Sequence, residues 1–154
     1  MSQPAGGFKP GAPVQSPKPD WVNWFEQRLG WTEFDHDKEL SRGWRLTSDC
    51  KSFRTVVGEE HAWCGMSLAT ALDDNGWQYP EECEAAIAYA KYGVKVAPET
   101  LYAIAVIEHA SGKHHVAIWM GDRMILGGNQ DNKICVKKMA DSDRVIAWRW
   151  PIRK

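Results

Sequence analysis

The last third of the chain consists of short β-prone runs that follow one another too closely for helices to lie between them. Turn sequences such as Ser111-Gly112 and Gly127-Gly128-Asn129 separate these runs. Parallel neighbours would need crossover connections of about a dozen residues or more, so the spacing predicts an antiparallel sheet. We expect about five strands, over residues 102–108, 114–120, 123–126, 133–138 and 145–150.

Helical patterns fill the part of the chain before these runs. Asp20 suits the N-cap of the first predicted helix and Gly30 its C-terminal cap, while Pro80 suits the first turn of the third. Helices followed by a meandering sheet predict an α+β fold, with N-terminal helices packed on a C-terminal antiparallel sheet. The expected helices cover residues 21–29, 62–72 and 80–93, with one or two short ones within 31–60.

The length and charge favour one ordinary globular domain. The 154 residues carry a net charge of −1, with 44% apolar and 25% charged residues, which excludes a wholly disordered chain and disfavours nucleic acid as a partner. Residues 1–19 hold five of the eight prolines and predict a flexible leader before a single domain over 20–154. The N-terminus lacks a secretory pattern, so we expect synthesis in the cytoplasm without a signal peptide.

The four cysteines show no metal-ligand pattern. Cys50, Cys64, Cys83 and Cys135 contain no CxxC pair and no ligand-like spacing to histidine, so neither a metal site nor any cofactor is expected. A chain of this length can bury a core without disulfides. We therefore expect individual thiols.

Cys64 is the thiol best placed to be reactive. It lies at the expected N-terminus of the helix over residues 62–72, where unpaired backbone N–H groups and the helix dipole favour a thiolate. The alternative is a buried cysteine that acts as a small apolar residue.

A thiolate needs a proton-transfer partner, and two adjacent histidines open a predicted strand. His114 and His115 face opposite sides of the sheet because strand residues alternate. One of them is expected to face the Cys64 helix, but the periodicity does not choose between them. The alternative is that the histidine is a polar surface residue.

An amide side chain follows on the next predicted strand. Two glycines precede Asn129 and would let the backbone bring this amide to the histidine; a simple turn asparagine is the alternative. Cysteine, histidine and asparagine in this order are also the order of papain-like hydrolases.

Five segments together resemble a branch of the NlpC-type cell-wall peptidases, related to CHAP amidases, which occurs in phage lysis proteins and bacterial cell-wall enzymes. The resemblance runs from about residue 21 to residue 152. The segments are Trp63-Cys64, Tyr92-Gly93-Val94, His115-Val116-Ala117, Leu126-Gly127-Gly128-Asn129-Gln130 and Trp148-Arg149-Trp150-Pro151.

The resemblance implies a papain-like catalytic domain that cleaves amide bonds in peptidoglycan. It matches Cys64 to the nucleophile, His115 to the base and Asn129 to the residue that orients the imidazole. Trp63, Gln130 and His114 are expected to support the site or bind substrate. Two positions depart from the family pattern: Ala117 replaces the usual glycine, and Tyr102-Ala103-Ile104 stands where a Gly-Asp commonly opens the first core strand. CHAP domains also often carry a glutamate at the position of Gly127, so no carboxylate is expected to orient the histidine.

The resemblance also implies partners and a place of action. The substrate would be the peptidoglycan stem peptide, cleaved by an endopeptidase or an N-acetylmuramoyl-L-alanine amidase. We expect a monomer that acts in the periplasm or on the wall after release or injection, with an immunity protein or a phage pore-former as a candidate partner. Two other functions stay open: a non-catalytic wall-binding module with a Trp and Tyr groove, and a thiol acyltransferase or deamidase that acts on a protein.

Overall fold

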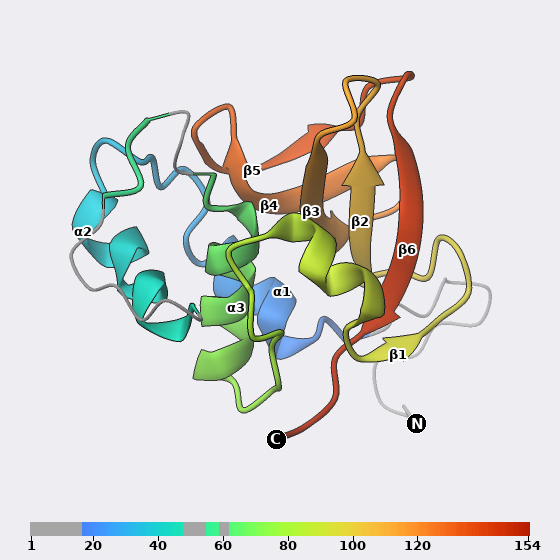
Figure 1. Ribbon diagram of the computed structural model, residues 1–154, viewed down its shortest axis with the longest axis horizontal. Helices are drawn as coiled ribbons and strands as arrows, with labels where there is room; N and C mark the ends of the chain where they lie inside the picture. Colours follow the sequence, from blue (N-terminus) through green and yellow to red (C-terminus); the bar gives the residue numbers. More distant parts are fainter. Residues whose placement is uncertain (1–16, 48–54, 59–61) are drawn as a thin grey trace, which may run out of the picture.

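The computed structural model describes residues 17–47, 55–58 and 62–154 (Figure 1). Nearly all of the predicted leader, as well as Cys50, lies outside these residues. The α+β class is confirmed: helices pack against one antiparallel sheet of six strands. The described helices include none that is long and apolar enough to cross a membrane.

The elements follow one another in a simple order. They are α1 (Asp20–Glu26), α2 (Asp37–Leu40), the 3-10 helix η1 (Ser41–Leu46), α3 (Cys64–Asp74), the 3-10 helix η2 (Ala86–Lys91), β1 (Val94–Lys95), β2 (Ile104–Glu108), β3 (His114–Trp119), β4 (Met124–Gln130), β5 (Lys133–Lys138) and β6 (Arg144–Trp150).

The sheet has the strand order β1-β6-β2-β3-β4-β5, and every neighbouring pair is antiparallel. The five predicted strands are present as β2 to β6, but the expected number was one too low. The missed strand, β1, is only two residues long and pairs Val94 with Trp150. Two residues carry no alternation that a sequence pattern could reveal.

The strand β4 is longer than predicted and runs through the Gly127-Gly128 pair to Gln130. The reversal comes after it, at Asp131 and Asn132, which both have positive φ, at 54° and 63°. Between Gly127 and Gln130 the pairing with β5 shifts register, and Asn129 there has a φ of 54°. Such an irregularity changes which side chains face which side of a strand.

The helix predicted over residues 80–93 is wrong, because only η2 forms there. The chain before η2 lies against α3, so closely that a Cβ at Gly65 would stand 2.3 Å from the Cys83 carbonyl oxygen. Tyr89 of η2 is fully buried and its hydroxyl donates to the Gly65 carbonyl at 2.6 Å. This packing overrides the helix propensity of the alanines.

The predicted cap of the first helix is also wrong. Pro19 occupies the cap position of α1, and Asp20 is the first helical residue. The Asp20 carboxylate instead accepts a hydrogen bond of 2.7 Å from the Trp77 indole.

The core lies between the helices and one face of the sheet, with α1 and α3 at the left of the strands and η2 in front of them (Figure 1). Five tryptophans are buried and the other four are partly buried, so the aromatic content builds the core. A smaller cluster covers the opposite face of the sheet, from Ala105, Ile107, Ala117, Trp119, Ile125 and Met139.

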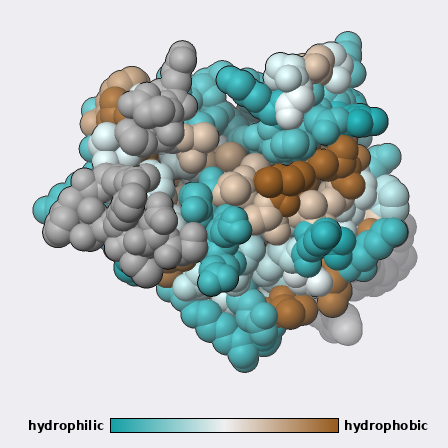
Figure 2. Space-filling model, viewed as in Figure 1, coloured by the Kyte–Doolittle hydropathy of each residue, from teal (hydrophilic) through white to brown (hydrophobic). Residues whose placement is uncertain are grey.

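The surface on the η2 side is mostly polar. A large apolar area on this face lies beside η2, with smaller ones elsewhere (Figure 2), and Ile87 is the exposed large apolar residue of η2.

Candidate active site

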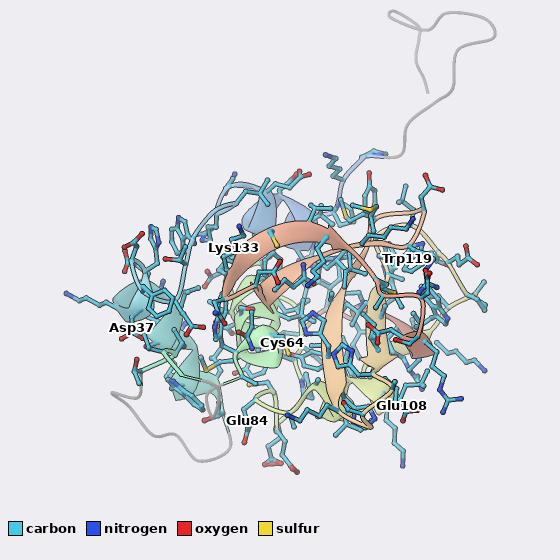
Figure 3. All side chains as sticks on the ribbon, turned by 90° about the horizontal axis from the view of Figure 1, so that it is seen from above. Asp37, Cys64, Glu84, Glu108, Trp119 and Lys133 are labelled. Carbon is cyan, nitrogen blue, oxygen red and sulfur yellow. The ribbon has the colours of Figure 1, made fainter. Side chains whose placement is uncertain are left out.

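Cys64 is the first residue of α3 and carries a free thiol that is 5% exposed. It lies near the centre of the molecule viewed from above, where α3 meets the sheet (Figure 3). The first turn of a helix leaves backbone N–H groups without carbonyl partners. The Gly65 N–H is one of these groups, and it donates to the Cys64 sulfur.

The sulfur lies where the sheet splits. Strands β3 and β4 pair at only two positions, Ile118 with Leu126 and Trp119 with Ile125. After these two pairs β4 packs against α3, so closely that a Cβ at Gly128 would lie 2.4 Å from the Ser67 hydroxyl. The Val116 N–H of β3 donates to the Cys64 sulfur. The sulfur therefore accepts a backbone hydrogen bond at the edge of β3 where a residue of the neighbouring strand would otherwise accept it.

The split explains why His115, and not His114, reaches the thiol. Val116 packs with α3 in the main core, whereas Ala117 belongs to the cluster on the opposite face. Alternation alone would therefore put His114 on the helix side. Because the sulfur meets the strand at its edge, the His115 imidazole bonds to it from the other face.

His114 does not support this pair by contact. Its Nε2 lies 3.3 Å from a Glu108 carboxylate oxygen, and the other oxygen of that carboxylate accepts hydrogen bonds from Arg144. The pKa of Glu108 is lowered, chiefly by its hydrogen bond to Arg144. His114 is thus part of a surface ion cluster, and its expected supporting role has no structural basis among the described residues.

Gln130 is the residue that holds the His115 ring. Its Oε1 lies 2.9 Å from His115 Nε2. Its amide nitrogen donates to the Ile125 and Cys135 carbonyls at 3.2 and 2.7 Å, which fixes the direction of the amide. Because Oε1 can only accept, His115 Nε2 carries the proton and Nδ1 is left for the thiol.

The contact with the imidazole that was expected of Asn129 is made by Gln130 instead. Within the described structure no hydrogen bond joins Asn129 to the ring, although both residues border the same pocket. The register shift between Gly127 and Gln130 exchanges the positions that face His115. The spacing of residues in the sequence would identify the hydrogen-bond partner of His115 only if β4 were a regular strand without a register shift.

The electrostatics favour a thiolate–imidazolium pair. Burial alone would raise the pKa of the Cys64 thiol, but the His115 charge, its hydrogen bond and the N–H groups of Val116 and Gly65 together lower it. Burial alone would lower the pKa of His115, yet the Cys64 charge and the bonds to Cys64 and Gln130 raise it. The sulfur, the ring and the fixed amide have the arrangement of a nucleophile, an acid–base group and an orienting group.

Comparison with known proteins adds no family to this geometry. No protein-family model matches the sequence, and no curated protein matches it either. The chemistry of the site is therefore inferred from its own residues. In the described part of the chain, no three His, Cys, Asp or Glu side chains are grouped so that they could hold a metal ion.

We expect Cys64 to react with iodoacetamide at a pH well below that at which an ordinary thiol, with a pKa of about 8.5, ionises. The lowered pKa of Cys64 and the raised pKa of His115 both favour the state in which the sulfur is anionic and the ring cationic. Labelling rates from pH 4 to 10, read by peptide mass spectrometry, test this. Cys83, whose pKa is raised to about 12 by burial first and Glu84 second, is the internal control. Equal profiles for the two thiols would contradict the ion pair.

For a reaction in which Cys64 is the nucleophile and His115 the acid–base group, the Gln130→Ala variant is expected to lose roughly 10- to 100-fold in kcat/KM. The reason is that the ring is no longer held as the Nε2–H tautomer. Gln130→Glu keeps an acceptor and should lose less. The matched control is Asn129→Gly, which tolerates the positive φ and should change kcat/KM by less than about threefold. A larger loss in the control than in Gln130→Ala would restore Asn129 as the orienting residue.

Glu33 is a residue of this region that the sequence did not reveal. Its side chain is 3% exposed, and its two carboxylate oxygens accept hydrogen bonds of 3.1 Å from the Trp63 indole and from the Gly58 N–H. Trp63 is itself fully buried, so it positions the start of α3 and offers no ring surface to a substrate. A lone glutamate in a mixed segment gives no periodic signal that it is buried.

Replacing Glu33 with alanine is expected to lower the free energy of unfolding by about 3 kcal/mol, because one buried and one partly buried donor lose a charged acceptor. The midpoint of urea unfolding measures this loss. Glu39→Ala, which removes an exposed carboxylate of α2, should stay within about 0.5 kcal/mol of the native protein. Equal effects of the two variants would show that the Glu33 contacts contribute little.

Proposed function

We propose that this protein is a cysteine hydrolase with a papain-like core that cleaves amide bonds in bacterial peptidoglycan. The observation that carries the proposal is the Cys64–His115 pair with the Gln130 amide behind it. A buried thiol at a helix start is common, but a lowered pKa together with an oriented imidazole is typical of a nucleophile.

In the proposed reaction the Cys64 thiolate attacks the amide carbonyl carbon and forms a C–S bond. The tetrahedral intermediate places its negative charge on the carbonyl oxygen, for which backbone N–H groups at the start of α3 are candidate donors. The C–N bond then breaks as His115 gives its Nδ1 proton to the leaving nitrogen. The products of this step are an amine and a thioester on Cys64.

The second half of the reaction regenerates the enzyme. Water attacks the thioester carbonyl while the neutral His115 ring accepts a proton from it at Nδ1. The C–S bond breaks, the acid leaves and Cys64 is again a thiolate beside an imidazolium. The Gln130 amide accepts from Nε2–H throughout, so the same ring nitrogen faces the sulfur in both steps.

Peptidoglycan as the substrate is supported by the five segments between Trp63 and Pro151 that resemble NlpC-type and CHAP enzymes. The bond is either the amide between muramic acid and L-alanine or a link within the stem peptide. The wall-binding alternative has less support, since none of the nine tryptophans has an exposed side chain. An open aromatic platform for sugars would need one.

The test is digestion of purified sacculi by the purified chain in the presence and absence of dithiothreitol. We expect new amino groups to appear only under reducing conditions, and mass spectrometry of the soluble fragments to show one type of cleaved amide. Iodoacetamide pretreatment should stop the release. A reduced protein with a reactive Cys64 that releases nothing would overturn the proposal. Product formed only when a second protein is added would indicate an acyltransferase or deamidase instead.

A further inference from the structure

The Gln130 amide, which holds the candidate acid–base residue, is bound from the neighbouring strand. Gln130 is 3% exposed, and its Oε1 lies 2.9 Å from His115 Nε2. At the other end of the amide, Nε2 donates to the Ile125 carbonyl at 3.2 Å and to the Cys135 carbonyl at 2.7 Å. Of these two carbonyls, that of Cys135 on β5 is the closer. The direction of the amide therefore depends on where Cys135 lies relative to Gln130.

The Cys135 side chain also contacts Gln130. Its thiol donates to the main-chain carbonyl of Gln130 at 3.4 Å, and its Sγ lies 3.9 Å from Gln130 Nε2. Cys135 is a free cysteine that is partly buried. A thiol is a weak donor, but this thiol bonds to the same residue whose amide donates to the Cys135 carbonyl. Cys135 thus contacts both the backbone and the side chain of Gln130.

These contacts lie at the register shift between β4 and β5, which run side by side (Figure 1). Gly127 pairs with Cys135, and the next pair toward the turn is Gln130 with Lys133. On β4 two residues lie between these pairs and on β5 only one, which is the pattern of a β-bulge. Regular ladder hydrogen bonds are disrupted at a bulge. The bonds between Cys135 and Gln130 therefore contribute more to the orientation of Gln130 than they would in an unbroken ladder.

We propose that Cys135 is a positioning residue of the candidate active site, whose thiol holds the bulge between β4 and β5 in the form that directs the Gln130 amide at His115. The catalytic consequence of this placement rests on the proposed function, but the placement itself does not. In the described part of the chain Cys135 bonds to neither Cys64 nor His115, so it acts on them through Gln130.

The position of the amide affects the charges of the Cys64–His115 pair. Burial lowers the pKa of His115, whereas the charge of Cys64 and the hydrogen bonds to Cys64 and Gln130 raise it. An amide that turns away from the ring gives up the Gln130 contribution. Burial raises the pKa of the Cys64 thiol, and the His115 charge lowers it. Loosening the bulge should therefore reduce the fraction of Cys64 that is present as thiolate.

The experiment compares Cys135→Ala with Cys135→Ser in the full chain. The two variants differ by one hydroxyl group, which can donate to the Gln130 carbonyl as the thiol does. We expect iodoacetamide to label Cys64 in Cys135→Ala about threefold more slowly than in the native protein at about pH 6, the size of a partly lost hydrogen bond. Cys135→Ser should label at close to the native rate. Peptide mass spectrometry reads Cys64 separately from the other thiols.

Two further variants show whether the effect passes through Gln130. Val136→Ala changes the next residue of β5, which is 41% exposed and pairs with Leu126, and should leave the labelling rate of Cys64 unchanged. In the Gln130→Ala background, Cys135→Ala should cause no further change, because the amide through which it acts is already absent. Urea unfolding checks that each variant is folded under the labelling conditions.

The outcomes separate this assignment from the proposed function. A native labelling rate in Cys135→Ala, an equal loss in Cys135→Ser, an equal loss in Val136→Ala, or a further loss in the Gln130→Ala background would each overturn the role of Cys135 and leave the hydrolase intact. Amine release from sacculi should follow the labelling rates through the same variants. If the labelling pattern is as expected but the native protein releases nothing, the hydrolase proposal fails, while Cys135 stands as a positioning residue of the ion pair.

Discussion

The Cys64→Ala variant is expected to lose at least about four orders of magnitude in amide hydrolysis, because no other group can form the thioester. The site leaves no substitute: His115 is bonded to this sulfur, and the N–H groups of Val116 and Gly65 point at it. The measurement is amine release from sacculi. The assay is sensitive enough if it still detects release by the native protein after ten-thousandfold dilution.

A control must show that the lost activity does not come from unfolding. Alanine in place of a buried cysteine removes one sulfur atom from the core edge and should cost about 1 kcal/mol of stability. Urea unfolding of both proteins checks this. Hydrolysis by Cys64→Ala within tenfold of the native rate, in folded protein, would remove the nucleophile from the proposal.

The His115→Ala variant is expected to lose about three orders of magnitude, since it removes both the charge that holds the thiolate and the proton donor for the leaving amine. Its iodoacetamide profile should move to higher pH, because Cys64 loses the interactions that lower its pKa. A purely structural role for His115 would not shift that profile.

His114→Ala is the matched control, one position away on the same strand. It breaks only the contact with Glu108, so hydrolysis should change by less than about threefold and the labelling profile should stay in place. If His114→Ala were the more damaging variant, the register of β3 at the site would be wrong by one residue.

Much of the architecture could be predicted because it follows local rules. Short β-prone runs without room for crossovers gave β2 to β6, and the small residues after Cys64 gave α3. The elements that the sequence did not predict correctly depend on contacts between distant parts of the chain. β1 exists through its pairing with β6, and the chain before η2 is shaped by contact with Gly65.

The candidate site was predictable in its chemistry and less so in its geometry. The positions of Cys64 and His115 followed from the helix start, the strand and the family resemblance. The choice between Asn129 and Gln130 depended on one register shift, which no alternation pattern contains. Glu33 lies thirty residues before Trp63, and such a long-range contact leaves no mark on the local sequence.

The early separation of β3 from β4 lowers the stability of the sheet but leaves the Val116 N–H free to bind the Cys64 sulfur. A further rung between these strands would strengthen the sheet, yet it would engage the Val116 amide and turn it away from the sulfur. Substitutions that extend the pairing of β3 with β4 should therefore raise the free energy of unfolding and lower the reactivity of the Cys64 thiol. Under the proposed function, the gap between the two strands exchanges stability of the sheet for reactivity of Cys64.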